Sequence, residues 1–248
     1  MSAKINILNP DKPKKVVLVA SNPTISQQTG WQIGVWASEF THPYYEFTEH
    51  GYQVEIVSPD GGKLEIDSFS NPRDPSGYSA DDLISLGFLS SPKHMALIEN
   101  TNSIDRVNVA DYDAIFVCGG QGPMYTFIDN KKLHTIFAQF YEAGKVVAAI
   151  CHGTCILLKT KLASGKLLVE EKTWTGFANS EEQYADSFVG KRIQPFWIED
   201  EAKQISNTNF ITGGRFQPFA VRDDRLITGQ QQYSGAAAAR LVLEALGV

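Results

Sequence analysis

The sequence predicts an α/β fold built around a parallel β-sheet, and three observations support this class. The chain has 248 residues, a length that a single doubly wound α/β domain can reach. Short apolar runs rich in β-branched residues alternate with longer segments of helical periodicity. The short runs are apolar throughout, which is typical of strands covered by helices on both faces. Alternating strands and helices favour parallel crossover connections.

The first predicted elements are a strand, a helix and a second strand. Lys15 to Ser21 (KVVLVAS) is predicted to be a buried strand. A polar loop leads to a helix over Trp31 to His50, which Pro43 is expected to end or kink. Gly51 is suited to stop this helix. Gln53 to Ser58 (QVEIVS) is the second predicted strand, which a right-handed crossover would place beside the first.

A segment of different composition follows the second strand. The Gly, Pro, Asp and Ser residues between Pro59 and about Ser79 predict an irregular surface loop. The next stretch, Ser79 to Asn108, is predicted to form two short helices with Ser79 and Ser91 as N-caps. Residues from about 59 to 110 are therefore expected to form a cap-like insertion.

The second half of the chain continues the alternation of strands and helices. Strands are predicted at Ala114 to Cys118 and Val146 to Ile150, with a helix over Phe127 to Glu142 between them. The remaining predicted elements are strands at Thr173 to Phe177 and Arg225 to Thr228 and a helix over Ser234 to Leu246. No repeat or linker divides the chain, so residues 1–248 are predicted to be a single domain. The expected fold is a flavodoxin-like three-layer sandwich with a mostly parallel central sheet and small inserted helices.

The composition restricts the possible functions. The net charge is −6 and no block of Lys or Arg stands out, so nucleic acid is not an expected partner. The N-terminal stretch MSAKINILNPDKPKK lacks the apolar core of a secretory signal, and no apolar run approaches the ~20 residues of a membrane helix. Three cysteines, Cys118, Cys151 and Cys155, fit free thiols in a reducing compartment. The sequence thus predicts a cytoplasmic protein without membrane association.

Cys151 is the main candidate for chemistry. It directly follows the predicted strand Val146 to Ile150 and starts a helical stretch, which places it at the carboxyl edge of the sheet, where α/β folds bind ligands. Such a sharp strand-to-helix turn is a nucleophile elbow, in which backbone N–H groups can hold an oxyanion and the helix N-terminus can lower the pKa of a thiol.

Position alone leaves a second interpretation of Cys151 open, because free cysteines are often buried as small hydrophobic residues. The next two residues favour the catalytic interpretation. His152 supplies an acid/base beside the thiol, and Gly153 permits close packing at the turn.

Several stretches resemble one protein family. VVAAICHGTCILL resembles the Cys-His-Gly elbow of the ThiJ/PfpI superfamily, whose fold is like that of class I glutamine amidotransferases. Four further stretches match in the same order: IGVWASEFTHPYYEF, FVCGGQGPMYTF, TWTGFANSEE and DDRLITGQQQYSGAAAARLVLEAL. The resemblance covers nearly the whole chain. Glu39 with His42, Pro43 and Tyr44 after it resembles the branch that holds chaperones and glyoxalase III enzymes.

The resemblance implies a role for each matching residue. Cys151 matches the nucleophile and His152 the acid/base. Glu182 matches the acid that orients the histidine, with Glu181 as the alternative. Glu39 matches a buried carboxyl group against the sulfur.

The glycine-rich loop that follows the third strand has a matching role. The backbone N–H groups of Gly120 and His152 match the oxyanion donors, with Gly153 at the elbow. Gln121 departs from the family, because this branch often carries histidine in this place. A glutamine can hydrogen-bond to an oxyanion or a hydroxyl but cannot relay a proton at neutral pH.

Other interpretations of these residues stay open from the sequence. Glu182 is also suited to the first turn of a helix, and Glu39 to a solvated helix face. Cys155 is expected to be a core residue one helical turn after Cys151, with a resolving thiol as the alternative. No metal site is predicted, because these histidines lack ligand-like spacing: His42, His50, His94 and His134.

The resemblance implies a cofactor-free glyoxalase III of the D-lactate dehydratase type. It would convert methylglyoxal or a related 2-oxoaldehyde to a 2-hydroxy acid through a Cys151 hemithioacetal. The alternatives are a holding chaperone or oxidative-stress sensor that uses the same thiol, and a cysteine-dependent peptidase, amidase or deglycase. The expected partners are a small aldehyde and a second copy of the chain in a homodimer.

Overall fold

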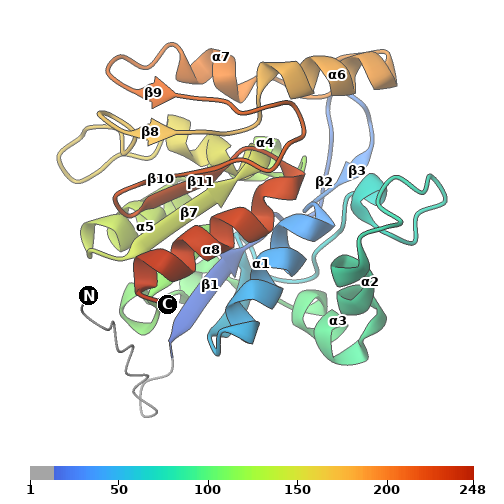
Figure 1. Ribbon diagram of the computed structural model, residues 1–248, viewed down its shortest axis with the longest axis horizontal. Coiled ribbons are helices and arrows are strands. Elements are labelled where there is room, and N and C mark those ends of the chain that lie inside the picture. The colour runs from blue at the N-terminus through green and yellow to red at the C-terminus, as the bar shows by residue number, and fades with distance from the viewer. Residues whose placement is uncertain (1–13) are drawn as a thin grey trace.

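The computed structural model describes residues 14–248 (Figure 1). Residues 1–13 lie outside the described residues. They include most of the N-terminal stretch that was tested above for a secretory signal. A seven-stranded sheet has the strand order β10-β11-β7-β6-β1-β4-β5. Its strands are β1 (Lys15–Val19), β4 (Gln53–Ser58), β5 (Asn102–Ser103), β6 (Ala114–Val117), β7 (Val146–Ile150), β10 (Ala220–Asp223) and β11 (Leu226–Gly229). All neighbouring pairs are parallel except β10 and β11, which confirms the predicted mostly parallel sheet.

Helices cover both faces of this sheet (Figure 1). The flanking elements are α1 (Ala37–Glu49) and α8 (Gly235–Leu246) on one face and α5 (Lys131–Glu142) and the 3₁₀ helix η4 (Cys151–Leu158) on the other. Successive residues of β1 point to opposite faces, since Leu18 packs with Phe40 of α1 whereas Val17 belongs to the core that includes Phe137 of α5. The three-layer sandwich is therefore confirmed.

The first helix is shorter than predicted. It begins at Ala37, because residues 31–36 are held in extended structure: β3 (Gln32–Ile33) pairs with β2 (Thr24–Ile25), and Val35 bridges Ile66. The prediction that Pro43 ends the helix is wrong. Pro43 lies inside α1, where its ring fixes a helical φ and its missing N–H costs one hydrogen bond.

The insertion contains more structure than a loop and two helices. Its elements are η1 (Ser68–Ser70), α2 (Leu83–Ser90), α3 (Pro92–Glu99), β5, η2 (Ile104–Arg106) and η3 (Val109–Asp111). Asp82 rather than Ser79 caps α2, since its carboxylate accepts the Ser85 N–H at 3.0 Å. Ser91 caps α3 as predicted. β5 is only two residues long and has no alternating pattern to reveal it.

The second half of the chain contains several short elements outside the central sheet. The helix predicted over Phe127 to Glu142 is divided into α4 (Pro123–Thr126) and α5, which Asn130 caps. The predicted strand at residues 173–177 is only β8 (Thr173–Trp174), and it pairs with β9 (Asn209–Phe210) outside the central sheet. The other elements here are α6 (Asn179–Val189), α7 (Ile198–Ala202) and η5 (Gln232–Ser234). Within residues 14–248, no helix is both long enough and apolar enough to cross a membrane.

Candidate active site

The Cys151 elbow is a strained turn at the end of β7. Cys151 has φ 53°, in the left-handed region that side chains avoid, and is 3 % exposed. Two glycines make room for it. A Cβ at Gly119 would lie 2.7 Å from the Cβ of Cys151, and a Cβ at Gly153 would lie 2.5 Å from the carbonyl oxygen of Cys118. The local backbone therefore fixes the sulfur at the carboxyl edge of the sheet.

His152 links the thiol to a carboxyl group. The Cys151 Sγ lies 3.5 Å from His152 Nδ1, and His152 Nε2 lies 3.0 Å from Oε1 of Glu182 in the first turn of α6. The imidazole stacks on Phe177 with ring centroids 4.2 Å apart. When the Glu182 carboxylate accepts a hydrogen bond from the Nε2–H, the lone pair of Nδ1 faces the thiol, so this histidine can take up the thiol proton.

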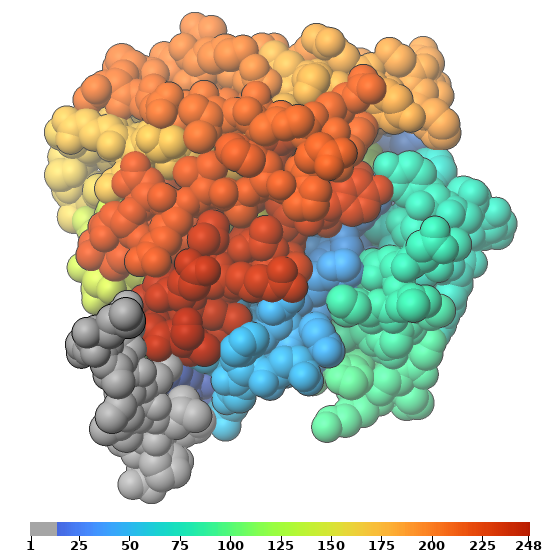
Figure 2. All heavy atoms as spheres, viewed as in Figure 1, coloured from blue at the N-terminus to red at the C-terminus, as the bar shows by residue number. Residues whose placement is uncertain are grey.

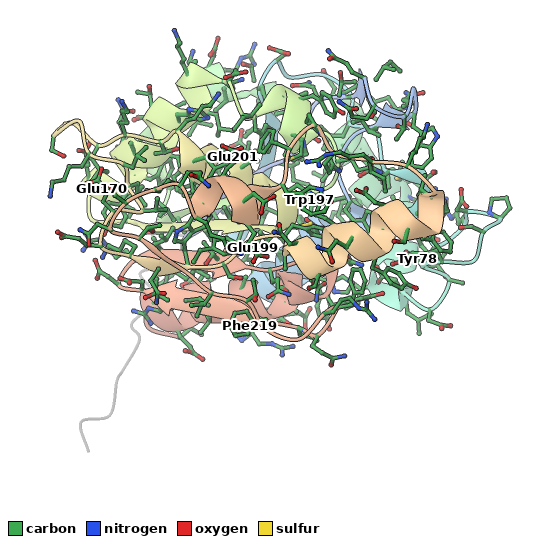
Figure 3. The ribbon with its side chains drawn as sticks, turned by 90° about the horizontal axis from the view of Figure 1, so that it is seen from above. Tyr78, Glu170, Trp197, Glu199, Glu201 and Phe219 are labelled. Carbon is green, nitrogen blue, oxygen red and sulfur yellow. The ribbon has the colours of Figure 1, made fainter. Side chains whose placement is uncertain are left out.

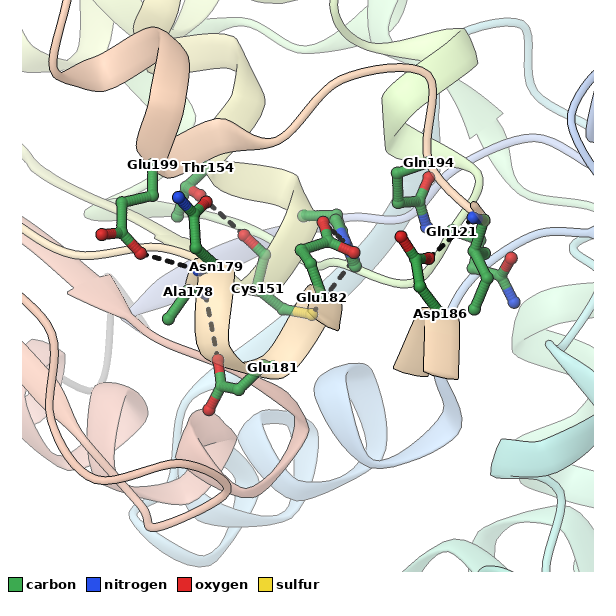
Figure 4. Close-up of polar contacts among 12 residues, drawn as sticks. Gln121, Cys151, Thr154, Ala178, Asn179, Glu181, Glu182, Asp186, Gln194 and Glu199 are labelled. Carbon is green, nitrogen blue, oxygen red and sulfur yellow. Dashed lines mark hydrogen bonds and ion pairs between the residues drawn. The ribbon is translucent and has the colours of Figure 1, made fainter. Parts of the chain in front are cut away.

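The two neighbouring glutamates have different contacts. Glu181 Oε1 accepts hydrogen bonds from the Phe216 N–H at 2.9 Å and the Gln230 amide at 2.8 Å, and its Oε2 accepts the Ala178 N–H at 3.0 Å. Figure 4 shows Glu181 directed toward Ala178, at the start of α6. Glu181 therefore closes the helix start, and Glu182 is the glutamate that reaches the histidine.

Glu39 is a fully buried carboxyl group beside the thiol. It stands in the first turn of α1 with 0 % exposure. Burial raises the pKa of Glu39 to about 8, while the Cys151 thiol and the backbone N–H groups of Gly119 and Gly120 oppose this rise. Glu39 is therefore mostly protonated at neutral pH and can donate its proton to the sulfur.

The expected lowering of the thiol pKa is wrong. Burial raises the pKa of Cys151 well above its usual range, and a negative charge on Glu39 would raise it further. The backbone N–H groups of His152 and Gly120 oppose this effect. The fold buries the sulfur, and this burial outweighs the effect of the helix N-terminus on the thiol pKa. The thiolate therefore has to form by proton transfer when the substrate binds.

The N–H groups of Gly120 and His152 lie close to the sulfur, where an oxyanion would form. Gly120 has φ 101°, and a Cβ there would lie 2.4 Å from the backbone nitrogen of Trp36. Only glycine fits this position without a shift of the backbone.

Asp67 fixes the glycine-rich loop by accepting two backbone hydrogen bonds. Its Oδ1 accepts the Gly34 N–H and its Oδ2 accepts the Gln121 N–H, both at 2.8 Å. Asp67 is buried, and this burial raises its pKa to about 6. Sequence reasoning missed Asp67, because it lies in a polar segment where nothing distinguishes it from a surface carboxylate.

The site opens into a small pocket. Its cavity of about 130 Å³ has Cys151, His152, Glu39 and Glu182 among the lining residues, and aromatic side chains supply much of the rest. Much of this aromatic lining comes from the insertion and from the segment around α6. Figure 2 shows these two segments meeting at one end of the molecule.

Two glutamines contribute polar atoms to this pocket. The side-chain Oε1 atoms of Gln121 and of Gln194 are buried without a hydrogen-bond partner among the described residues. Both amides can therefore accept or, when rotated, donate a hydrogen bond to a ligand. Gln194 was not predicted, because it lies in a connecting segment without a motif.

The model of one protein family matches the chain from residue 33 to residue 245: the DJ-1/PfpI family. The chain belongs to the DJ-1/PfpI family. A relative from Saccharomyces cerevisiae, named glutathione-independent glyoxalase HSP31, is 30% identical over 244 residues, which are 94% of this chain and 98% of the relative. Glyoxalase 3 of Candida albicans is 27% identical over 87% of this chain and 91% of its own.

Solved structures of the family agree with the fold. The Rapid Encystment Protein 24 KDa of Francisella tularensis superposes with a TM-score of 0.83 and 29% identity, covering 94% of this chain and 99% of its own. Glyoxalase III from Candida albicans superposes with a TM-score of 0.80 and 25% identity, covering 94% and 97%.

Other histidines and cysteines lie apart from the hydrogen-bonded set of Cys151, His152 and Glu182. His42 pairs with Asp82 at 2.8 Å, and His134 contacts the Phe127 carbonyl. Between residues 14 and 248, no group of three or more His, Cys, Asp or Glu residues is placed to hold a metal ion. Cys155 is a free thiol in the hydrophobic core, with its sulfur 3.5 Å from the Pro123 carbonyl.

Proposed function

We propose that the protein is a glutathione-independent glyoxalase of the D-lactate dehydratase type, which converts a 2-oxoaldehyde such as methylglyoxal to a 2-hydroxy acid. The observation that carries the proposal is the arrangement of Cys151, His152 and Glu182 beside a protonated Glu39 in a pocket of about 130 Å³. The relatives named as glyoxalases support the same reaction.

The first step forms a carbon–sulfur bond. The aldehyde carbon C1 binds next to Cys151, whose proton passes to Nδ1 of His152 as the sulfur attacks. Glu182 stabilises the imidazolium that results. The hemithioacetal oxygen accepts the N–H groups of Gly120 and His152.

The second step transfers a proton within the substrate. The His152 imidazolium first gives its proton to the hemithioacetal oxygen. The neutral imidazole then moves the proton from C1 to C2 through an enediol, which leaves a thioester on Cys151. Water then breaks the thioester and releases the 2-hydroxy acid. The oxidation of C1 balances the reduction of C2, so the reaction needs no redox cofactor. Gln121 supplies no proton here, and its amide binds a substrate oxygen.

The geometry favours this reaction over two of the alternatives, a peptidase and an oxidant sensor. A pocket of about 130 Å³ suits a small carbonyl compound better than a peptide. A sensor thiol is typically exposed with a lowered pKa, whereas Cys151 is 3 % exposed with a raised pKa. We further infer a single domain in which residues 59–110 act as a cap, because Phe69 and Tyr78 of this segment line the pocket.

A test of the function is D-lactate formation from methylglyoxal by the purified protein in the absence of glutathione. We expect turnover by the natural protein and none above background by the Cys151→Ala variant. Cys155→Ala is the matched control, because it removes a thiol from the same 3₁₀ helix outside the pocket. Absence of turnover by a folded protein with reduced Cys151 would refute the proposal.

A further inference from the structure

One wall of the pocket is a continuous row of four aromatic rings. Trp36 meets Tyr78 edge-to-face with centroids 6.0 Å apart, Tyr78 meets Phe69 at 6.0 Å, and Phe69 meets Trp31 at 6.3 Å. Two of these rings come from the segment before α1 and two from the insertion. Figure 3 shows Tyr78 near α6, whose side chains also line the pocket.

A second group of aromatic side chains also lines the pocket and forms its second wall. Phe177 stacks on His152, and Tyr184 of α6 meets Phe216 edge-to-face at 5.3 Å. Phe188 of α6 lines the same pocket although its side chain is 68% exposed. The pocket is therefore lined by two aromatic walls, with its carboxyl, imidazole and thiol groups gathered at Cys151.

Methylglyoxal leaves most of this aromatic surface without a contact. Its only apolar group is one methyl, which would contact a small part of the aromatic surface. With C1 bonded to Cys151 at the bottom of the site, the substituent on C2 is the part of the substrate free to extend along the walls. A flat ring there would gain edge-to-face or stacked contacts with the wall rings. A cavity of about 130 Å³ is also close to the ~150 Å³ of an engineered apolar cavity that binds benzene.

We propose that the preferred substrate is a 2-oxoaldehyde that carries an aryl group on its keto carbon, an inference that rests on the proposed glyoxalase function. The aryl ring binds between the wall of Trp36, Tyr78 and Phe69 and the wall of Phe177, Tyr184 and Phe188. The reaction consumes one aryl 2-oxoaldehyde and one water and yields one 2-aryl-2-hydroxy acid. The bonds made and broken at C1 and C2 are those of the proposed function.

The test compares kcat/KM for phenylglyoxal and for methylglyoxal in the absence of glutathione, with mandelate and lactate measured as products. We expect kcat/KM to be at least ~10-fold higher for phenylglyoxal, since even one methylene in an apolar pocket is worth about 10-fold or more. Turnover of methylglyoxal with an equal or lower value for phenylglyoxal would overturn the inference and leave the glyoxalase function intact. No turnover of either compound would overturn both.

A variant that lacks one wall ring tests whether a preference for phenylglyoxal comes from contacts with the wall or from the intrinsic reactivity of the compound. Phe188→Ala removes a ring that is largely exposed, so the fold is expected to tolerate the change. We expect the phenylglyoxal-to-methylglyoxal ratio of kcat/KM to fall at least ~3-fold, mainly through KM for phenylglyoxal. Leu83→Ala, at a 73% exposed position of α2 outside the pocket, is the control and leaves the ratio unchanged. An equal ratio in both variants would contradict the aryl subsite.

Discussion

The floor and the mouth of the pocket are built by different parts of the chain. The floor lies at the ends of β6 and β7, where close backbone packing at Gly119 and Gly153 fixes a buried thiol. The mouth consists of side chains from the insertion and α6, and several of them are exposed, such as Tyr78, Tyr184 and Phe188. Under the proposed function, the sheet edge holds the reacting thiol, and the insertion and α6 supply the surface that contacts the rest of the substrate.

The largest expected effect concerns two adjacent glutamates in the first turn of α6, one of which contacts His152 of the floor. Glu182→Gln keeps the size of the side chain but removes the charge that stabilises the imidazolium, so we expect kcat to fall ~10³-fold with little change in stability. Glu181→Gln disturbs three hydrogen bonds that close α6, and we expect a loss of about 2 kcal/mol in the free energy of unfolding instead. Steady-state kinetics and urea unfolding of both variants check this contrast. Equal kinetic effects would refute the assignment.

The next effect concerns the oxyanion donor of the floor. A Cβ at position 120 would collide with the backbone of Trp36, so Gly120→Ala displaces the N–H that faces the sulfur. Loss of one such donor lowers kcat ~10²-fold. Gly144→Ala is the matched control: Gly144 also has positive φ, at 76°, but open space around it, and kcat should be unchanged. Similar kcat values for the two variants would show that the Gly120 N–H has no catalytic role.

A third prediction concerns pH. Because the folded pKa of Glu39 is about 8 and lies above its usual value of 4.5, the stability that its protonated form contributes is full below about pH 4.5 and is lost as pH rises toward 8. Glu39→Gln stays neutral, so its free energy of unfolding at pH 8 should exceed that of the natural protein by about 4 kcal/mol, and little difference should remain near pH 4.5.

Unfolding by urea across this pH range measures the effect. Asp67, with a pKa of about 6, is present in both proteins, so the difference between them isolates Glu39. The kcat/KM of the natural protein should also fall as pH rises through about 8, as Glu39 loses the proton that it donates to the sulfur. A pH-independent difference in stability would contradict the raised pKa.

The smallest expected effect lies where the floor meets the insertion. Asp67→Asn leaves one of the N–H groups of Gly34 and Gln121 without an acceptor, which loosens the glycine-rich loop. We expect kcat/KM to fall about 3–10-fold and the free energy of unfolding by about 1 kcal/mol. Asp74→Asn lies in the same insertion outside the pocket and keeps an oxygen that accepts the Ser76 N–H, so it is the control and should have no effect on either. An unchanged kcat/KM in Asp67→Asn would show that the loop does not depend on this contact.

Regular periodicity made much of the fold predictable. The apolar runs that became β1, β6 and β7 differ from their predicted bounds by at most two residues, because a strand buried on both faces has to be apolar throughout. Short elements were missed or misjudged. β5 has two residues, and the extended stretch before α1 depends on pairing with β2 and Ile66, partners that local sequence does not reveal.

For the site, the sequence by itself determined the elbow and its neighbours, since Cys151, His152 and Gly153 are contiguous and their strand is unmistakable. Tertiary structure alone decided that Glu182 rather than Glu181 reaches the histidine, that Asp67 holds the glycine-rich loop, and that burial raises the pKa of the thiol. The physical reason is distance along the chain. Contacts between residues some 30 or more positions apart, and the exclusion of water from them, arise only when the sheet edge, the insertion and α6 pack together.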